Sequence, residues 1–381
     1  MNKILQYGSI EAIPLYNCSG MTPDEWSLRD GVRREVYGLG EMLYGVLLTV
    51  TPLLRSPLAR HSPATRVHID RHSSALHSPA TCPPFPRHSL APQAQFFQLL
   101  YLPIIAVLLE KEHIKMSCYK IMTCLAIIDT MAIWVTSLIT GFFAFQGVVY
   151  CTYPNLQYIT GMFALGLWAC SCVTAMSLVI NRLIEFTAPS LGRLVFHGYR
   201  TFFWIGFCLC YGGFFMVFTR PVVFASQDHA WVFDPMIFPN HSLDYENVYH
   251  RYNNLFIVGF TGVLYISFCF VIGQKMKSTG DTTSKNQASS TQIFIQSAII
   301  CAFNQIAAII YVIMNLIEVP FWLIIFAHTM WQLGHGAPAL IYTCLNKTIR
   351  NGVRRKLAGL GKRKKKKDNI SRGPSTVLIK V

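Results

Sequence analysis

Six long apolar runs constrain this chain more than any other feature. Each has 19 to 25 residues, and Asp129 is the single Asp, Glu, Lys or Arg among them. Because about 20 apolar residues cross the hydrocarbon core of a bilayer, each run can form one membrane-spanning helix. Only 13% of the residues are charged, against about 25% in soluble domains, so we expect no soluble enzyme. The runs are Ile121–Phe143, Gln157–Ile180, Thr201–Thr219, Leu255–Gly273, Ile293–Ile317 and Phe321–Leu345.

A seventh span is divided into two apolar halves, 36–54 and 96–109, by the segment 55–95. This segment is rich in Pro, Ser, His and Arg, and His61–Thr65 is repeated at His77–Thr81. Such a composition cannot bury a core. Our hypothesis is that it is an intron read as coding sequence, or a recent insertion. The alternative is a genuine exposed loop between two short hydrophobic segments.

The basic residues predict which side of the membrane each end of the bundle faces. With seven spans and the N-terminus outside, 22 of the 33 Lys and Arg fall on the inner side and six on the outer side, and five lie in 55–95. Cytoplasmic loops favour basic residues in this way. We therefore expect an extracellular tail at 1–35, the bundle at 36–345 and a cytoplasmic tail at 346–381. The sequons at Asn17 and Asn240 would face outward and carry glycans.

The C-terminal tail contributes +12 of the net charge of +15. Residues 346–356 can form a basic amphipathic helix, and six consecutive basic residues follow at Lys362–Lys367. We expect this tail to lie on the anionic lipids of the inner leaflet. A nucleic-acid-binding patch is a poor alternative in a chain with seven spans.

Two acidic residues inside the predicted spans are candidates for function. A carboxylate is costly in a membrane, so we interpret Asp129, in the middle of the second span, as the organiser of a central polar network or as a cation ligand. The alternative is a protonated carboxyl that hydrogen-bonds to a neighbouring helix. Glu41, in the first span, is interpreted as a structural residue near the outer interface.

His328 and His335 in the last span suggest a metal site with Asp129, but their spacing disfavours it. Seven residues separate their backbones by about 10 Å along a helix, whereas ligands of one zinc each lie about 2 Å from it. The cysteine pairs Cys170/Cys172 and Cys208/Cys210 lack metal-finger spacing and are expected to pack as small hydrophobic residues. We predict no metal and no other cofactor.

Outside the spans, setting aside Cys82 in the insert, Cys18 and Cys151 are the cysteines on the oxidising side. We predict a disulfide between them, which would tie the N-terminal segment to the top of the third helix. Two free thiols are the alternative.

At the inner end of the third span, Asn181 and Arg182 follow 24 uncharged residues. In a bundle that opens toward the cytosol, this Arg could bridge helices when closed and meet a partner when open. The alternative is an interfacial Arg that reaches the lipid headgroups.

Short motifs along the chain form a specific combination, although each is weak alone. They are Tyr16–Gly20, Ser117–Met122, Gln146–Pro154, Leu178–Leu183, Trp231–Pro235, Ile293–Ser297 and Gly336–Tyr342. Together they resemble the nematode serpentine chemoreceptors of class T, a family of seven-helix G-protein-coupled receptors. The chain resembles rhodopsin-like receptors more loosely, through Leu125–Asp129, but it has no Cys in its second outer loop and has Ala337-Pro338 where Asn-Pro is usual.

The resemblance implies an all-α membrane protein with rhodopsin-like seven-helix architecture and no enzymatic activity. It implies detection of an environmental chemical in an outer cavity and activation of a heterotrimeric G protein, in the plasma membrane of sensory cilia. We accordingly expect Asn181 and Arg182 to face the G protein, and Trp168, Tyr265 and Trp331 to line the cavity. A Trp or Tyr in a membrane is, however, more often a packing or interface residue.

Two other functions remain open at this point. A ligand-gated channel or a transporter of similar span count predicts a different topology or a polar pore. A trafficking-defective product is expected if residues 55–95 are translated.

Overall fold

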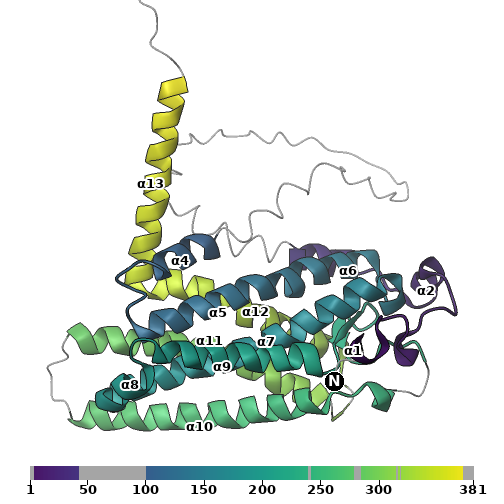
Figure 1. Ribbon diagram of the computed structural model, residues 1–381, viewed down its shortest axis with the longest axis horizontal. Helices are drawn as coiled ribbons and strands as arrows, with labels where there is room; N and C mark the ends of the chain where they lie inside the picture. Colours follow the sequence, from purple (N-terminus) through teal and green to yellow (C-terminus); the bar gives the residue numbers. More distant parts are fainter. Residues whose placement is uncertain are drawn as a thin grey trace, which may run out of the picture.

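The computed structural model describes residues 4–42, 100–238, 242–278, 285–314, 316–317 and 319–371. Figure 1 shows long helices lying side by side along one axis, and a last helix that leaves one end of the bundle across that axis. The elements are α1 (Ile4–Tyr7), η1 (Pro14–Tyr16), α2 (Pro23–Asp30), α4 (Tyr101–Leu108), α5 (Ser117–Ile133), η4 (Trp134–Ile139), α6 (Thr140–Gln146), η5 (Tyr150–Thr152), α7 (Pro154–Thr187), α8 (Pro189–Phe196), α9 (Arg200–Phe218), β1 (Val223–Ala225), β2 (Ala230–Val232), η6 (Ser242–Tyr245), α10 (Val248–Ser278), α11 (Lys285–Met314), α12 (Phe321–Leu345) and α13 (Lys347–Ser371).

The expected all-α membrane fold is confirmed, although not every predicted span can be identified by its length and hydropathy. Within the described residues, five helical segments are long and apolar enough to cross a bilayer, and they belong to α5–α6, α7, α9, α10 and α11. Helix α12 has 25 residues but is not among them. Its buried His328, Gln332 and His335 lower its hydropathy. These polar residues are buried against other helices, which makes a polar segment compatible with a membrane.

The divided first span is described only in part. Residues 35–42 are helical and α4 covers most of the second half, while the segment 55–95 lies outside the described residues. Several other helices run beyond the predicted apolar cores. Helix α7, for example, has 34 residues where the sequence predicts a span of 24, because its polar ends continue the helix past the apolar stretch.

Helix α7 forms the centre of the bundle. Of its 18 most apolar consecutive residues, 89% are buried, whereas only 22% of the corresponding residues of α9 are buried. Gly166 of α7 and Gly212 of α9 face one another, and a side chain on Gly212 would lie 2.7 Å from the Gly166 carbonyl oxygen. The two helices therefore pack at close range. The outer face of α9 exposes Phe203 and Phe207, which suits contact with lipid.

The second span is one continuous helix from Ser117 to Gln146 that contains a π-helical turn, η4. The Thr140 hydroxyl donates to the Val135 carbonyl at 2.7 Å across this turn. The Thr136 carbonyl accepts a hydrogen bond from Gln332 Nε2 of α12 at 2.7 Å. The π turn thus joins this helix to α12 through a side chain.

One end of the bundle is closed by a cap, which we define as residues 4–34 together with the hairpin 223–232. A disulfide joins Cys18 of the N-terminal segment to Cys151, just before α7. Tyr16 is buried among the rings of Tyr150, Tyr158 and Tyr245, with centroids 5.1 to 5.6 Å apart. The segment expected as a tail is therefore packed on the bundle, because aromatic burial and a cross-link hold it there.

The hairpin of β1 and β2 pairs Val223 with Val232 in an antiparallel ladder and lies against the N-terminal segment. The Arg34 side chain donates to the carbonyls of Ser226 and Gln227 in its turn. On the bundle side the hairpin approaches α7 so closely that a side chain on Gly161 would overlap the Val222 carbonyl. The hairpin therefore forms a roof over the bundle interior.

Candidate functional site

A cavity of about 160 Å³ lies beneath this roof, between α7, the hairpin, α10, α11 and α12. Its walls are mainly aromatic and aliphatic, with no Asp, Glu, Lys or Arg among the lining residues. The lining residues are Ala164, Leu165, Trp168, Val222, Trp231, Val232, Phe233, His250, Tyr311, Met314 and Trp331. A concave apolar site with a few polar groups is the usual form of a small-molecule binding site.

Buried hydrogen bonds hold two of the aromatic walls in place. Trp168 Nε1 donates to Asn254 Oδ1 at 3.2 Å, and Trp231 Nε1 donates to the Thr140 hydroxyl at 2.9 Å. Asn253 of α10 donates to the same Asn254 oxygen at 3.2 Å. These bonds fix the orientation of the indole rings and so preorganise the cavity.

The structure brings two of the three predicted cavity residues together. Trp168 and Trp331 both line the cavity, but Tyr265 does not. The Tyr265 hydroxyl instead donates to the Ala298 carbonyl of α11 at 2.6 Å. Tyr265 lies 15 residues beyond His250 on α10, which is about 22 Å farther along the helix. Helical rise therefore places it too deep in the bundle to reach the cavity.

A buried carboxylate with two histidines lies next to the cavity, and the sequence did not reveal it. Glu41 Oε1 lies 2.8 Å from His229 Nε2 of the hairpin turn and 3.1 Å from His328 Nε2 of α12. The His328 ring contacts Trp331 with centroids 5.7 Å apart. This cluster links three distant parts of the chain and supports one wall of the cavity. Glu41 and His328, which are polar residues within apolar segments, are the sequence signal that could have indicated it.

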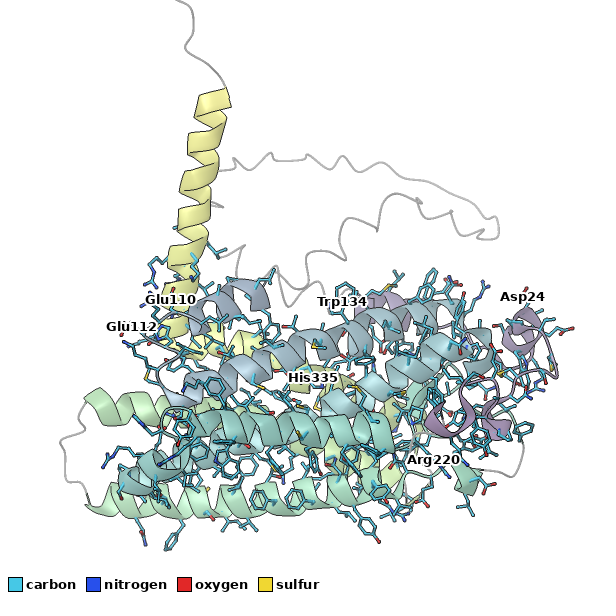
Figure 2. The ribbon with its side chains drawn as sticks, in the orientation of Figure 1. Asp24, Glu110, Glu112, Trp134, Arg220 and His335 are labelled. Carbon is cyan, nitrogen blue, oxygen red and sulfur yellow. A yellow bond between two sulfur atoms is a disulfide. The ribbon has the colours of Figure 1, made fainter. Side chains whose placement is uncertain are left out.

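Asp129 lies at the meeting point of four helices and is fully buried. Its Oδ1 lies 2.9 Å from His335 Nδ1 of α12 and accepts from Ser171 of α7 at 3.4 Å. Tyr101 of α4 contacts Asp129 Oδ2 at 3.4 Å and donates to the His335 carbonyl at 2.5 Å. Figure 2 shows His335 near the middle of the bundle. Asp129 thus lies in a hydrogen-bonded group with Tyr101, Ser171 and His335, of which the sequence suggested only His335, as part of a metal site.

The two histidines of α12 belong to separate clusters. His328 pairs with Glu41, and His335 pairs with Asp129. In the described part of the chain, no group of three or more His, Cys, Asp or Glu side chains is arranged to hold a metal ion.

At the end of the bundle opposite the cap, Asn181 and Arg182 lie in a hydrogen-bonded group with Ser117 and Glu185. Arg182 Nη2 lies 2.6 Å from Glu185 Oε2, and its side chain is only 10% exposed. Ser117 of α5 donates to Glu185 Oε1 at 2.6 Å. Arg182 is therefore paired with Glu185, three residues further along its own helix.

Helix α13 docks at this same end, which we call the basic end. Glu110, in the turn after α4, lies 2.8 Å from Arg355 and 3.1 Å from Lys356 of α13. Figure 2 shows Glu110 and Glu112 at this end, and Asp24 and Arg220 toward the cap. Partial burial of Glu110 opposes its ionisation and raises its pKa. The hydrogen bonds from Lys356 and Arg355 outweigh this effect and hold the pKa of Glu110 below its usual value.

The two predicted glycosylation sites differ in what the structure describes. Asn17 is exposed, and its Oδ1 accepts from the Ser19 backbone N–H at 2.9 Å. Asn240 lies outside the described residues.

Comparison with known proteins gives a family for this arrangement. The family model described as "Serpentine type 7TM GPCR chemoreceptor Srt" matches residues 3–56 and 91–367. The match passes over 57–90, inside the predicted insert. Serpentine receptor class T-55 of Caenorhabditis elegans is 31% identical over 261 residues, which is 67% of this chain and 70% of that receptor.

A helical bundle that crosses the membrane several times, with a small cavity beneath a cap, defines a multi-pass membrane protein. The matched family is one of seven-helix chemoreceptors. The chain belongs to this serpentine class T family.

Proposed function

We propose that this receptor binds a small environmental chemical in the cavity beneath the cap and activates a heterotrimeric G protein at the basic end. The observation that carries the proposal is the cavity itself, which lies between four helices and a hairpin and is lined by Trp168 and Trp331. A molecule that fits one arrangement of these elements better than another shifts the receptor between conformations.

The polar groups of the bundle offer a physical connection between its two ends. Helix α12 contributes Trp331 to the cavity and His335 to the Asp129 network, and α7 contributes Trp168, Ser171 and Arg182. A movement of either helix at the cavity therefore acts on groups nearer the basic end. We assign Asp129 the role of organising this network.

Arg182 is the residue we place at the G-protein end, together with Asn181. In the structure its charge is satisfied by Glu185, so binding of a partner there requires that pair to open. Glu185 is the more exposed member of the pair, so water can replace Arg182 at its carboxylate when the pair opens. This makes Glu185 a restraint that ligand binding in the cavity can release.

Nucleotide exchange on purified heterotrimeric G proteins tests the coupling. The receptor is reconstituted in lipid vesicles and stimulated with a pool of small neutral organic compounds. We expect stimulated exchange with the wild type, a large loss with Arg182→Ala, and little change with Arg193→Ala on the neighbouring helix α8. Undiminished exchange by Arg182→Ala would remove Arg182 from the coupling site.

The cellular setting is part of the same proposal. We place the receptor in the plasma membrane of sensory cilia, with the cap and its glycans at Asn17 and Asn240 outside. The basic residues of α13 would lie along the anionic lipids of the inner leaflet, which fits a helix that crosses the bundle axis in Figure 1.

A further inference from the structure

The buried cluster of Glu41, His229 and His328 joins the roof of the cavity to α12. A carboxylate only accepts, so His229 Nε2, in the hairpin turn, donates to Glu41 Oε1 at 2.8 Å. His328 Nε2 of α12 lies 3.1 Å from the same oxygen. The side chains of the three residues are only 1–11% exposed. Their contacts therefore connect the hairpin turn to the helix that carries Trp331 and His335.

His328 Nε2 faces a donor as well as this acceptor. Gln332, one turn farther along α12, places its Nε2 3.1 Å from His328 Nε2. The Gln332 nitrogen also donates to the Thr136 carbonyl at 2.7 Å, which identifies it as the amide NH₂ group. That group has a second hydrogen to donate. His328 Nε2 is therefore as close to a donor as to an acceptor.

One ring nitrogen cannot satisfy both neighbours at once. With a hydrogen, His328 Nε2 donates to Glu41 and repels the amide hydrogen of Gln332. Without a hydrogen, it accepts from Gln332 and loses the bond to Glu41, whose Oε1 keeps the bond from His229. Nδ1 carries a hydrogen both in the charged ring and in the neutral ring that accepts from Gln332. These two states of His328 therefore differ by one proton on Nε2.

Charge makes that proton depend on pH. The histidine side chain ordinarily changes charge between about pH 5 and 8. Uptake of one proton from water by His328 places a cation beside the Glu41 carboxylate, so the cluster changes from one net negative charge to none. Pairing with a cation offsets the cost of a buried carboxylate. The bond between His328 and Glu41 is therefore favoured at low pH, and it is lost as pH rises through the value at which His328 releases the proton.

Other charged and titratable groups lie around the cluster. The Tyr37 ring is 5.4 Å from that of His229. Arg34 donates to carbonyls of the hairpin turn, and its charge acts on Asp228, the residue before His229. His250 faces the cavity from α10. Tyr and Arg keep one charge state between about pH 5 and 8, so Asp228 and His250 are the neighbours whose titration must be separated from that of the cluster.

We propose that His328 is a proton-operated latch on the roof of the cavity. Acidification on the cap side moves the hydrogen bond of its Nε2 from Gln332 to Glu41 and so fastens the hairpin turn to α12, and a rise in pH releases the turn. The Glu41 side chain is 11% exposed and gives the cluster access to protons from water. This inference goes beyond the proposed function, because the latch requires neither a ligand nor a G protein.

The protonation state of each ring nitrogen is the direct test. The full-length receptor with 15N-labelled histidine is studied in lipid nanodiscs by NMR at about pH 5 and about pH 8, and the His328 signals are assigned by their loss in His328→Gln. We expect His328 Nε2 to be unprotonated at the higher pH and protonated at the lower, with Nδ1 protonated at both. With fluorinated tryptophan, the 19F signal of Trp231 in the hairpin should shift over the same pH range, and that of Trp204 on α9 should not.

Two substitutions should move the latch in opposite directions. Gln332→Met removes the competing donor, so His328 Nε2 should stay protonated and bonded to Glu41 at both pH values. Glu41→Gln removes the charge that stabilises a histidine cation, so His328 Nε2 should stay unprotonated at both. If Glu41→Gln does not fold, the wild type and Gln332→Met decide. Asp228→Asn should leave the His328 transition in place, and His250 is distinguished by its own 15N signals.

Contrary results are equally specific. A protonated His328 Nε2 at the higher pH in the wild type, an unprotonated one at the lower pH, or an unchanged spectrum in Gln332→Met would overturn the latch. So would a Trp231 signal that does not follow His328, or loss of the transition in Asp228→Asn. Ligand-stimulated nucleotide exchange by a receptor whose His328 fails these tests would leave the proposed function intact. A pH-dependent His328 without nucleotide exchange on any G protein would contradict the proposed function and leave the latch intact.

Discussion

Asp129 and His335 are both fully buried, and each satisfies a polar atom of the other at 2.9 Å. Removing one member of such a pair leaves a buried polar group without its partner, whereas removing both leaves none. The sequence could identify Asp129 as exceptional because it is the one Asp, Glu, Lys or Arg in the six long apolar runs. It suggested His328 and His335 together as neighbours of Asp129 at a metal site but could not single out His335, because 206 residues separate Asp129 and His335 and only helix packing brings them together.

We predict that Asp129→Ala and His335→Ala each lower the free energy of unfolding by about 3–5 kcal/mol. The double substitution should cost clearly less than the sum, since each single change already breaks the same contact. Ser171→Ala, which loses a longer contact at 3.4 Å, is the control and should cost much less. Denaturant unfolding in detergent micelles provides the measurement, and additive losses would show that the two residues do not act as a pair.

His229 lies at the end of the hairpin turn in an unusual backbone conformation. Its backbone has φ of 53°, a left-handed conformation that a residue with a side chain rarely adopts, and its imidazole contacts Glu41. The contact to the bundle compensates for this conformational cost. The turn position was not predictable from the sequence, because nothing in it marks His229 as the end of a hairpin turn.

Replacing His229 by Gly and by Ala separates these two effects. Both variants lose the Glu41 contact, but only Ala retains the cost of the left-handed backbone, about 1–2 kcal/mol. We expect His229→Gly to be at least as stable as His229→Ala, although Gly ordinarily costs about 0.5–1 kcal/mol within regular structure. Thermal unfolding of the two purified variants measures the difference, and a markedly less stable Gly variant would argue against strain at this position.

Among the elements, the cap depends on a cross-link between parts of the chain 133 residues apart. The Cys18–Cys151 pair was predictable from the sequence by counting the cysteines on the oxidising side. The packing of Tyr16 among three further tyrosines was not, because it requires the ends of α7, η5 and η6 to converge. Burial raises the pKa of Tyr16 well above its usual value, which keeps this ring neutral in the cap.

We predict that Cys18→Ser and Cys151→Ser each reduce thermal stability and surface expression, and that the double variant is no worse than the poorer single variant. All three lose the same bond, whose stabilisation for a loop of this length is on the order of 4–5 kcal/mol in the chain-entropy account. Surface labelling and thermal unfolding measure the effect. A double variant that loses much more than either single one would indicate separate roles for the two cysteines.

The attachment of α13 at the basic end depends on Glu110. Because ion pairing lowers the pKa of this group in the folded state, its contribution is present at neutral pH and is lost as pH falls through that lowered pKa. We expect Glu110→Gln to increase amide hydrogen exchange in residues 347–356 at neutral pH. Glu112→Gln is the matched control, since Glu112 pairs with Lys115 and not with α13. Equal exchange in both variants would mean that α13 is held by its apolar contacts alone.

For the whole molecule, apolar runs, basic residues and short motifs were enough to predict the fold class and family. They were less able to predict the site, because cavity walls depend on helix rotation and loop position. Trp168 and Trp331 line the cavity whereas Tyr265 does not, and His250 contributes from a position that apolar patterning does not mark. The roof of the cavity is a hairpin in a loop, where periodicity gives no guide.

The proposed function requires the cap, and the cavity beneath it, to face the outside of the cell. The measurement is glycosidase-sensitive mobility of the expressed chain, with Asn17→Gln and Asn240→Gln, singly and together, as variants. We predict glycan on Asn17 and Asn240, each lost with its own substitution. Another sequon, Asn346-Lys347-Thr348, lies at the basic end, and we predict no glycan on it, because the Asn346 side chain is buried and caps the start of α13. Glycan on Asn346 with none on Asn17 or Asn240 would place the cavity on the cytosolic side and contradict the account.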